Sequence, residues 1–199
     1  RRRDGNHGGN ETRLRARGLY AAALFAILQG DYAAGKGQLQ ESLMIFREID
    51  DPRNVAYTLD SLAYLAIEQG EYPEAEARAR EAVDLLRARG SREGLCFSLI
   101  HLAIALRSRG EWAAAHELYE QSLATARELG TPWEIGTALR EIGLAECDGG
   151  RCDLALKDLA EAISVLHGLG DRPGVIESLD ALAGAAAATA APRRAARLW

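Results

Sequence analysis

The residue types that most often carry chemistry are few in this chain, and they are widely spaced. The four histidines are His7, His101, His116 and His167. A zinc site needs His and Cys ligands at short helical spacings, and no histidine here has such a neighbour. Cys147 and Cys152 stand five positions apart, which is not the C-x-x-C spacing that zinc prefers. We therefore expect no metal site, and we expect the thiols to act as small, reduced apolar side chains.

The corner Gly70-Glu71-Tyr72 is the stretch that most resembles a catalytic loop. A glycine, a carboxylate and an aromatic together fit a loop that positions a general acid or base, and they fit a joint between two helices equally well. The sequence holds no G-x-x-x-x-G-K-[ST] phosphate loop and no marked Ser-His-carboxylate set. Gly35 and Gly37 flank a lysine, but we expect them only to weaken a helix. We expect neither catalysis nor a cofactor.

The composition favours an all-α protein in a reducing compartment. Of the residues 48% are hydrophobic, much of this alanine, and only 6% are aromatic. Alanine is the strongest intrinsic helix former. A net charge of −5 argues against a nucleic-acid surface, and no apolar run approaches the roughly 20 residues of a membrane span. The three cysteines are sparse and odd in number, so we expect a cytoplasmic protein without membrane or direct nucleic-acid contacts.

An internal repeat decides how the Gly70 corner should be interpreted. The phrases QGDYAAG, QGEYPEA and RGEWAAA place Gly30, Gly70 and Gly110 at intervals of 40 residues, and a weaker copy follows at Gly150. Further glycines halve this period, and only Asp50 and Ala190 interrupt the series. Glycine is the usual residue just past a helix, because it enters the left-handed conformation without a Cβ penalty. The corner is therefore predicted to be a helix joint.

The same periodicity predicts the domain organisation. Residues 1–10 are expected to be a flexible polar leader, and residues 11–199 a domain of helix pairs. The full pairs are predicted at 11–50, 51–90, 91–130 and 131–170, with an incomplete fifth at 171–199. This gives about nine full helices and a truncated tenth. The fourth corner departs from the pattern, because Glu146 stands where an apolar residue is expected. We expect a local specialisation or a loosened joint there.

The repeat resembles the tetratricopeptide repeat. In SLAYLAIEQGEYPEAEARAREAV, Leu62-Ala63 take that family's Leu-small place, and Gly70 and Tyr72 take its turn. The small residues of the second helix are Ala75, Ala79 and Ala82. The 40-residue units and phrases such as TARELG and PRRAARLW are similar to the sensor arrays of bacterial LuxR-type and signal-transduction ATPase regulators. The resemblance implies a right-handed α-solenoid whose first helices line a concave groove.

The resemblance also supplies candidate binding residues, which are the groove-facing positions of each first helix. They are Tyr20, Leu24, Tyr57, Asp60, Tyr64, Phe97, Ile100, His101, Ile104, Arg140 and Leu144. The alternative is that these residues pack on the next helix. A partner with apolar anchors and some basic character would suit Asp60 and Glu141. A carboxylate clamp, which needs Lys, Arg and Asn at these places, is not expected.

The leading hypothesis is a non-catalytic interaction domain of a bacterial cytoplasmic regulator. Its groove would bind a protein or peptide partner, or other domains of the same parent protein. One alternative is a domain that senses a small-molecule inducer. Another is a structural spacer that forms homodimers through an open C-terminal end near Trp199.

Overall fold

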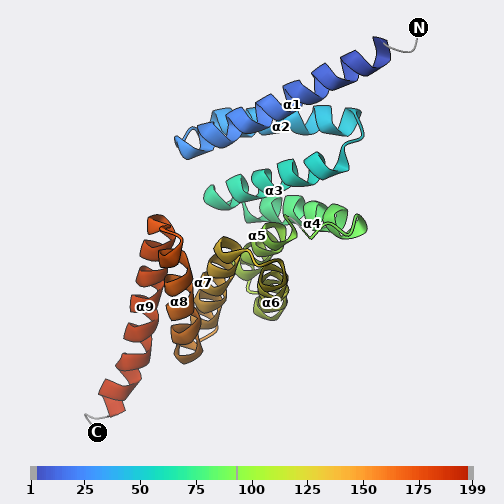
Figure 1. The fold of residues 1–199 in the computed structure, drawn as a ribbon. Coiled ribbons are helices and arrows are strands. Elements are labelled where there is room, and N and C mark those ends of the chain that lie inside the picture. The colour runs from blue at the N-terminus through green and yellow to red at the C-terminus, as the bar shows by residue number, and fades with distance from the viewer. Residues whose placement is uncertain (1–3, 93, 197–199) are drawn as a thin grey trace. The chain divides into compact units, whose positions relative to one another are not determined.

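The computed structural model describes residues 4–92 and 94–196, and the side chains of residues 10–92 and 94–190. Every regular element in this part of the chain is an α-helix, so the all-α prediction is confirmed (Figure 1). The helices are α1 (Asp4–Leu28), α2 (Tyr32–Glu48), α3 (Pro52–Glu68), α4 (Tyr72–Ala88), α5 (Leu95–Ser108), α6 (Trp112–Leu129), α7 (Pro132–Asp148), α8 (Cys152–Gly168) and α9 (Arg172–Ala196). None of the helices in the described residues combines the length and apolar character of a membrane span.

The predicted glycine stops are confirmed by the backbone geometry. The glycines at positions 30, 70, 90, 110, 130, 150 and 170 all have positive φ. At the second corner, the Gly70 amide donates to the Ile67 carbonyl at 2.9 Å and the Glu71 amide donates to the Ala66 carbonyl at 2.7 Å. This is the Schellman pattern that ends a helix. Asp50 enters the same region with φ 51° without being a glycine, because Asp tolerates the left-handed conformation better than most residues.

The predicted ends of the helical array were wrong in two places. Helix α1 already begins at Asp4, so residues 4–10 belong to it, whereas residues 1–3 lie outside the described part. Once a helix is nucleated, each added residue gains a backbone hydrogen bond, so α1 extends outward through weak helix formers. Helix α9 runs past Ala190 to Ala196, and no tenth helix begins within the described residues. Alanine at position 190 supplies no stop, because it favours helix where glycine would end it.

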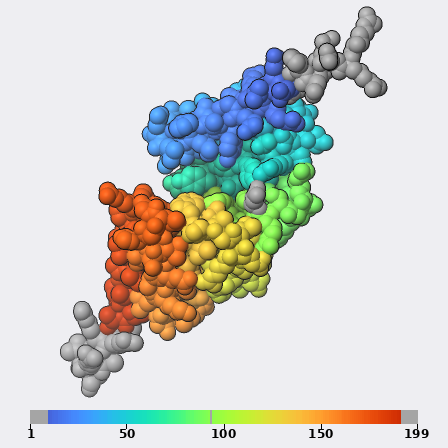
Figure 2. Space-filling view, in the orientation of Figure 1, coloured from blue at the N-terminus to red at the C-terminus, as the bar shows by residue number. Residues whose placement is uncertain are grey.

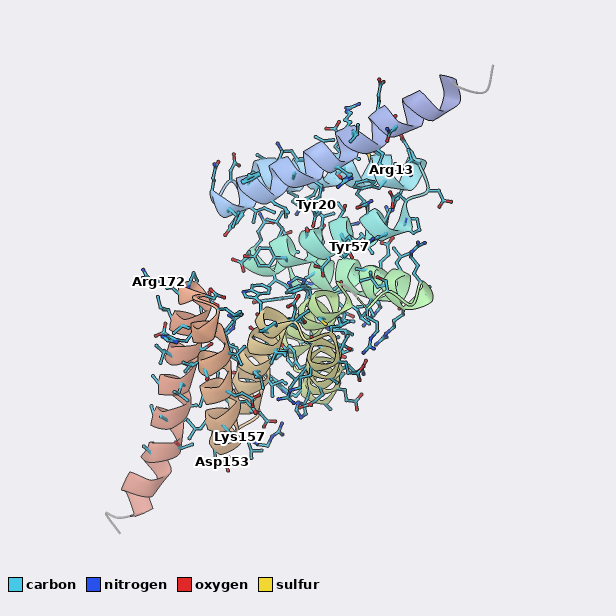
Figure 3. The ribbon with its side chains drawn as sticks, in the orientation of Figure 1. Arg13, Tyr20, Tyr57, Asp153, Lys157 and Arg172 are labelled. Atoms are coloured by element: carbon cyan, nitrogen blue, oxygen red, sulfur yellow. The ribbon has the colours of Figure 1, made fainter. Side chains whose placement is uncertain are left out.

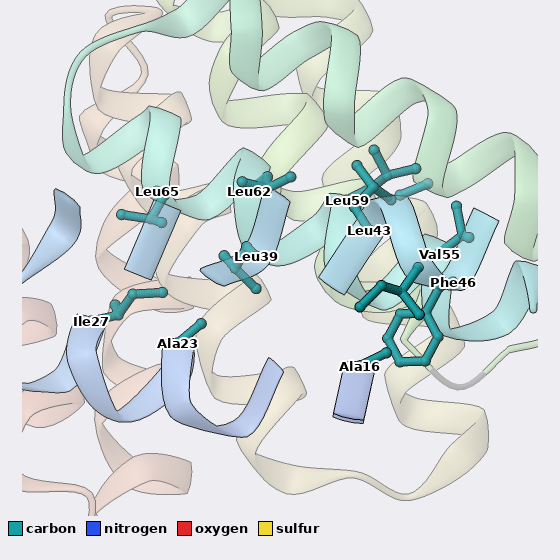
Figure 4. Close-up of a cluster of buried hydrophobic side chains, with 12 residues drawn as sticks. Ala16, Ala23, Ile27, Leu39, Leu43, Phe46, Val55, Leu59, Leu62 and Leu65 are labelled. Atoms are coloured by element: carbon teal, nitrogen blue, oxygen red, sulfur yellow. The ribbon is translucent and has the colours of Figure 1, made fainter. Parts of the chain in front are cut away.

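The chain forms two compact units, residues 1–105 and residues 106–199. In unit 1 the core lies between α1, α2, α3 and α4, where Ile27, Leu39, Phe46, Leu59 and Leu65 form one buried cluster (Figure 4). In unit 2, Leu159 of α8 and Ala185 of α9 share a further apolar cluster with the half-buried Cys147 and Cys152. Each helix pair therefore packs on the next pair in its unit, as expected for a repeat array.

Ion pairs connect neighbouring second helices within each unit. Among the second helices, Arg47 of α2 reaches Glu81 of α4 at 2.5 Å, and Arg127 of α6 reaches Glu161 of α8 at 3.0 Å. These two ion pairs occupy the same position of the repeat, 80 residues apart. A further ion pair joins α2 to the start of α4, because the Glu71 carboxylate accepts from Lys36 Nζ at 2.8 Å. The Glu71 side chain makes no capping hydrogen bond to its own helix. The lysine lowers the pKa of Glu71.

Small residues let the two helices of a pair approach closely. Ala75, Ala79 and Ala82 of α4 are fully buried, as the repeat pattern predicts. Two glycines of α7 go further. A Cβ at Gly136 would lie 2.6 Å from Leu166 Cγ, and a Cβ at Gly143 would lie 2.6 Å from Leu159 Cγ. The backbone of α7 thus packs directly on leucine side chains of α8, and a side chain at either glycine would separate the helices.

Gly35 and Gly37 of α2 give a matched test of this close packing. A Cβ at Gly35 would lie 2.8 Å from Ile27 Cγ1 and 3.3 Å from the Ala23 carbonyl, whereas a Cβ at Gly37 would meet nothing within 4 Å. We predict that Gly37→Ala raises the free energy of unfolding by up to about 1 kcal/mol, because alanine favours helix. Gly35→Ala should lower it by about 1–3 kcal/mol through overpacking. Urea titration followed by circular dichroism measures both. Equal effects would contradict the close approach of α1 and α2.

Candidate functional site

The candidate residues predicted from the sequence lie on the first helices, and in each unit we call the face that carries them the first-helix surface of that unit. Arg140 and Leu144 lie on α7 of unit 2, and the remaining candidates lie on α1, α3 and α5 of unit 1. Figure 3 shows Tyr20 on α1 and Tyr57 on α3, from neighbouring first helices. Because the candidates are divided in this way, the unit 1 and unit 2 portions of the first-helix surface each have a local structure of their own.

A tyrosine connects two neighbouring first helices of unit 1, α1 and α3. The Tyr20 hydroxyl and Ser61 Oγ lie 3.1 Å apart, which joins α1 to α3. Ser61 Oγ is also 3.1 Å from the carbonyl of Tyr57 on the same helix. Burial raises the pKa of Tyr20, so the phenol stays protonated and available as a donor. Tyr20 thus serves mainly to hold α1 against α3. For this residue the contacts favour packing on the next helix over partner binding.

The aromatic ring of Tyr57 contacts two residues. The Arg53 guanidinium carbon lies 5.6 Å from the ring centroid, within the range of a cation–π contact. Gly94 leaves space for the ring, because a Cβ at that position would overlap Tyr57. Gly94 has φ +76°, which also favours glycine there. Tyr57 is half-buried.

A carboxylate joins α3 to α5. Asp60 Oδ1 accepts from Ser98 Oγ at 2.8 Å and lies 2.9 Å from His101 Nδ1. The side chains of Asp60 and His101 are only 17% and 13% exposed, so this group is largely protected from solvent. The ring of His101 in turn lies against that of Tyr64, with centroids 5.8 Å apart and planes tilted by 41°. Asp60 is therefore engaged within the fold, which argues against the expectation that it receives a basic group of a partner.

The exposed apolar part of unit 1's first-helix surface is small. Tyr64 is 39% exposed and Leu24 is 38% exposed, whereas Phe97 and Ile104 are half-buried. Ile100 is only 2% exposed, so its place among the binding residues is corrected: it belongs to the core. Burying an isoleucine side chain stabilises the fold by about 1.5–3 kcal/mol, which favours a place in the core over one on a binding surface.

The unit 2 portion of the first-helix surface is an ion-pair network. Glu141 is 6% exposed. It lies 3.1 Å from Arg140 Nη2 and 3.8 Å from Arg107 Nη2. Arg140 continues the chain of charges to Glu177 of α9 at 2.5 Å. Leu144 is half-buried beside this network. Because Glu141 is buried and already faces two arginines, the structure argues against a basic partner at this residue as well.

Tyr119 extends the polar interior of unit 2. Its side chain is fully buried, and its hydroxyl has no hydrogen-bond partner within the described residues. Burial raises the pKa of this phenol, with the nearby Glu141 charge acting in the same direction. Arg107 Nη1 is another buried polar atom without a hydrogen-bond partner among the described residues. Sequence reasoning missed Arg107 and Tyr119, because both occupy positions that the repeat assigns to packing.

The fourth corner is specialised rather than loosened. Glu146 is 5% exposed, and its carboxylate binds Arg151 Nε at 2.5 Å across the α7–α8 joint. His116 Nε2 lies 3.7 Å from the same carboxylate. Cys147 and Cys152 are free thiols, and burial raises the pKa of Cys147 to about 12. Its thiolate is therefore unavailable as a nucleophile near neutral pH. The departure of Glu146 from the apolar pattern was the signal for this corner.

Side chains that bind metal do not converge in the described part of the chain. Groups of three or more His, Cys, Asp or Glu residues with metal-binding geometry are absent from it. The Glu146 cluster offers a carboxylate, an imidazole and a guanidinium, and the guanidinium already satisfies the carboxylate charge. The first-helix surface presents an aromatic ring, an aliphatic side chain and paired charges, which are the ingredients of a recognition surface.

Comparison with known proteins assigns the chain to a family. Family models described as tetratricopeptide repeat match residues 14–88 and residues 98–129, which together span more than half of the chain. The chain belongs to the tetratricopeptide repeat family. No curated protein matches the sequence.

Several solved structures share the fold. A kinesin light chain-type protein of Podosopora anserina with nearly identical TPR-like repeats has a TM-score of 0.70 at 19% identity, covering 94% of this chain and 92% of that one. A Rap protein complexed with competence and sporulation factor has a TM-score of 0.72 at 14% identity, covering 88% of this chain and 55% of that one. The signal-transduction ATPase with numerous domains PH0952 of Pyrococcus horikoshii, which has a tetratricopeptide repeat sensor, has a TM-score of 0.66 at 18% identity. That match covers 83% of this chain and 26% of the ATPase. At these identities the likeness establishes the helical-repeat solenoid fold.

Arg151 and Glu146 allow a test of the specialised corner. We predict that Arg151→Ala lowers the free energy of unfolding, because it leaves the buried Glu146 carboxylate without its closest cation. Adding Glu146→Leu should restore stability, since Leu106 occupies the same repeat position and is buried. Thermal unfolding of the two single variants and the double variant measures this. If Arg151→Ala has no effect, or if the double variant is no more stable than Arg151→Ala, the ion pair does not hold the corner.

Proposed function

We propose that this chain is a non-catalytic protein-interaction domain of a bacterial cytoplasmic regulatory protein. Its partner is a protein or peptide, and the first-helix surface of unit 1 is where it binds. Membership of the tetratricopeptide repeat family supports an interaction scaffold. The fold similarity to a Rap protein and to an ATPase with a tetratricopeptide repeat sensor supports a regulatory role.

The observation that carries the proposed site is the exposed ring of Tyr64. It is 39% exposed on α3, and its ring contacts His101 of α5. His101 is itself close to Asp60, so the neighbourhood of the ring is held by a hydrogen-bonded support. A rigid aromatic brings a large contact area at a low cost in conformational entropy, which is why such residues dominate binding energies. Leu24 adds an exposed aliphatic side chain on α1.

The internal pairing of charges defines the chemistry of the expected partner. Asp60 is satisfied by Ser98 and His101 in unit 1. Breaking that group to receive a basic side chain would cost the hydrogen bonds it already makes. The partner should therefore present apolar or aromatic anchors to Tyr64 and Leu24, with polar groups only at the edges.

Tyr64→Ala tests this proposal, with Tyr72→Ala as a matched control. Tyr72 is 36% exposed, nearly the same as Tyr64, but it begins the second helix α4. Peptides are selected from a phage-displayed random library on the unmodified chain, and their Kd values are then measured for each variant. We predict that Tyr64→Ala weakens the selected peptides by about tenfold or more, the size of a hot-spot loss, while Tyr72→Ala does not.

Two results would contradict the proposed function. One is a set of selected peptides that bind the Tyr64→Ala chain as tightly as the original. The other is an absence of peptide binders together with a thermal shift caused by a small metabolite, which would favour an inducer-sensing domain instead. Unfolding curves of both variants serve as a control that the fold is retained.

A further inference from the structure

Two of the chain's three cysteines lie on either side of the α7–α8 joint. Cys147 is in the last turn of α7, and Cys152 is the first residue of α8. The Cys152 thiol donates to the Cys147 carbonyl oxygen, with Sγ and O 3.7 Å apart. Burial, together with a hydrogen bond between the two thiols, raises the pKa of Cys147. The two sulfur atoms are therefore neighbours in the reduced chain.

The repeat register shows that both cysteines occupy positions that other corners use for packing. At intervals of 40 residues, Cys152 follows the aromatic residues Tyr32, Tyr72 and Trp112. In the same way, Cys147 follows Ile27, Ile67 and Arg107. At the first corner, Ile27 and Tyr32 pack in one apolar cluster, so the two positions belong together. The fourth corner thus has a pair of thiols where the first corner has a pair of apolar side chains.

The fourth corner combines access to solvent with freedom to adjust. Cys147 and Cys152 are half-buried, and residues 148–151 between them are exposed. The yellow-orange segments of unit 2, which include this corner, reach the molecular surface in Figure 2. A disulfide brings its sulfur atoms to about 2.05 Å, so the two thiols must move closer for the bond to form. Gly149 and Gly150 form the joint between them, and glycine backbones adjust at little steric cost.

We propose that Cys147 and Cys152 are a redox-sensitive pair, which closes into a disulfide when the chain meets a low-molecular-weight disulfide such as oxidised glutathione. The Cys152 thiolate attacks one sulfur of the oxidant, forms a mixed disulfide and releases one glutathione. The Cys147 sulfur then gives up its proton and attacks the Cys152 sulfur, which releases the second glutathione. The two cysteines lose two electrons and two protons, and these convert one oxidised glutathione into two glutathione thiols.

Burial determines the order of the two attacks. It raises the pKa of Cys147 to about 12, so this thiol is inert toward reagents in solution near neutral pH. The first attack therefore belongs to Cys152. Once Cys152 carries the mixed disulfide, the reaction with Cys147 is intramolecular, and the proximity of the two sulfurs compensates for the small thiolate fraction. In a reducing compartment the pair stays open until an oxidant accumulates.

The disulfide should make the α7–α8 joint more stable. The bond connects two positions that apolar packing connects at the first corner. It also closes a short loop, which lowers the conformational entropy of the unfolded chain. We predict that oxidation raises the midpoint of thermal unfolding of the full chain by about 4–8 °C, and that dithiothreitol reverses the shift.

Tryptic digestion identifies the bond, because Arg151 lies between the two cysteines. The full chain is incubated with oxidised glutathione, its remaining thiols are alkylated, and it is digested without reductant. In the reduced chain, cleavage after Arg151 separates Cys147 and Cys152 into two peptides. In the oxidised chain, mass spectrometry should find these two peptides linked. Cys96 should be alkylated in both samples, because it is buried in α5.

Serine variants assign the steps and define the results that would overturn the inference. Cys147→Ser should stop at the mixed disulfide on Cys152, and Cys152→Ser should give neither linked peptides nor a thermal shift. Cys96→Ser is the matched control and should keep both, with circular dichroism checking the fold of each variant. The inference is overturned if the unmodified chain keeps glutathione on Cys152 with Cys147 free, or if the new bond involves Cys96. It is also overturned if oxidation leaves the thermal midpoint unchanged or lowers it.

Discussion

Close approach between the two helices of a pair is the constraint on which the rest of the structure depends. Gly136 and Gly143 let α7 rest directly on Leu166 and Leu159, and a Cβ at either glycine would lie 2.6 Å from a leucine carbon. In α3 the fully buried Ala56 and Ala63 hold the equivalent places, 80 residues earlier. Because small residues fix the separation of the helices, within each unit the first helices lie on one side and the second helices on the other. A repeat built in this way has a continuous core and leaves its surfaces free to vary.

Polar contacts between neighbouring first helices then determine what the first-helix surface can offer. In unit 1, Tyr20 with Ser61 and Asp60 with His101 connect α1, α3 and α5. In unit 2, Glu141 lies between Arg140 and Arg107. These contacts satisfy charges that would otherwise attract a charged partner. Leaving such a charge unpaired costs more free energy the more deeply it is buried. The surface is left with apolar recognition groups held by a rigid polar support, and this is the arrangement on which the proposed function rests.

Local rules made the helix joints predictable, and contacts between distant residues made the site hard to predict. Gly70 ends α3 with φ +72° because glycine tolerates that conformation, which the sequence alone indicates. Asp50 does the same without glycine, and α9 passes Ala190 without a stop. The pairing of Asp60 with Ser98 joins residues 38 positions apart, and the burial of Ile100 depends on neighbouring helices. Repeat periodicity selects candidate positions, but it does not say which of them the fold itself uses.

Amide hydrogen exchange of the full chain, with and without a selected peptide, tests the central claim most directly, because it reports where a partner binds without any substitution. The account predicts that the peptide slows exchange in α1 and α3, centred on the turn of α3 that carries Tyr64, and in the part of α5 that carries His101. It predicts little change in α2 and α4. Protection confined to α2 and α4 would contradict the account, because the second helices would then form the binding surface.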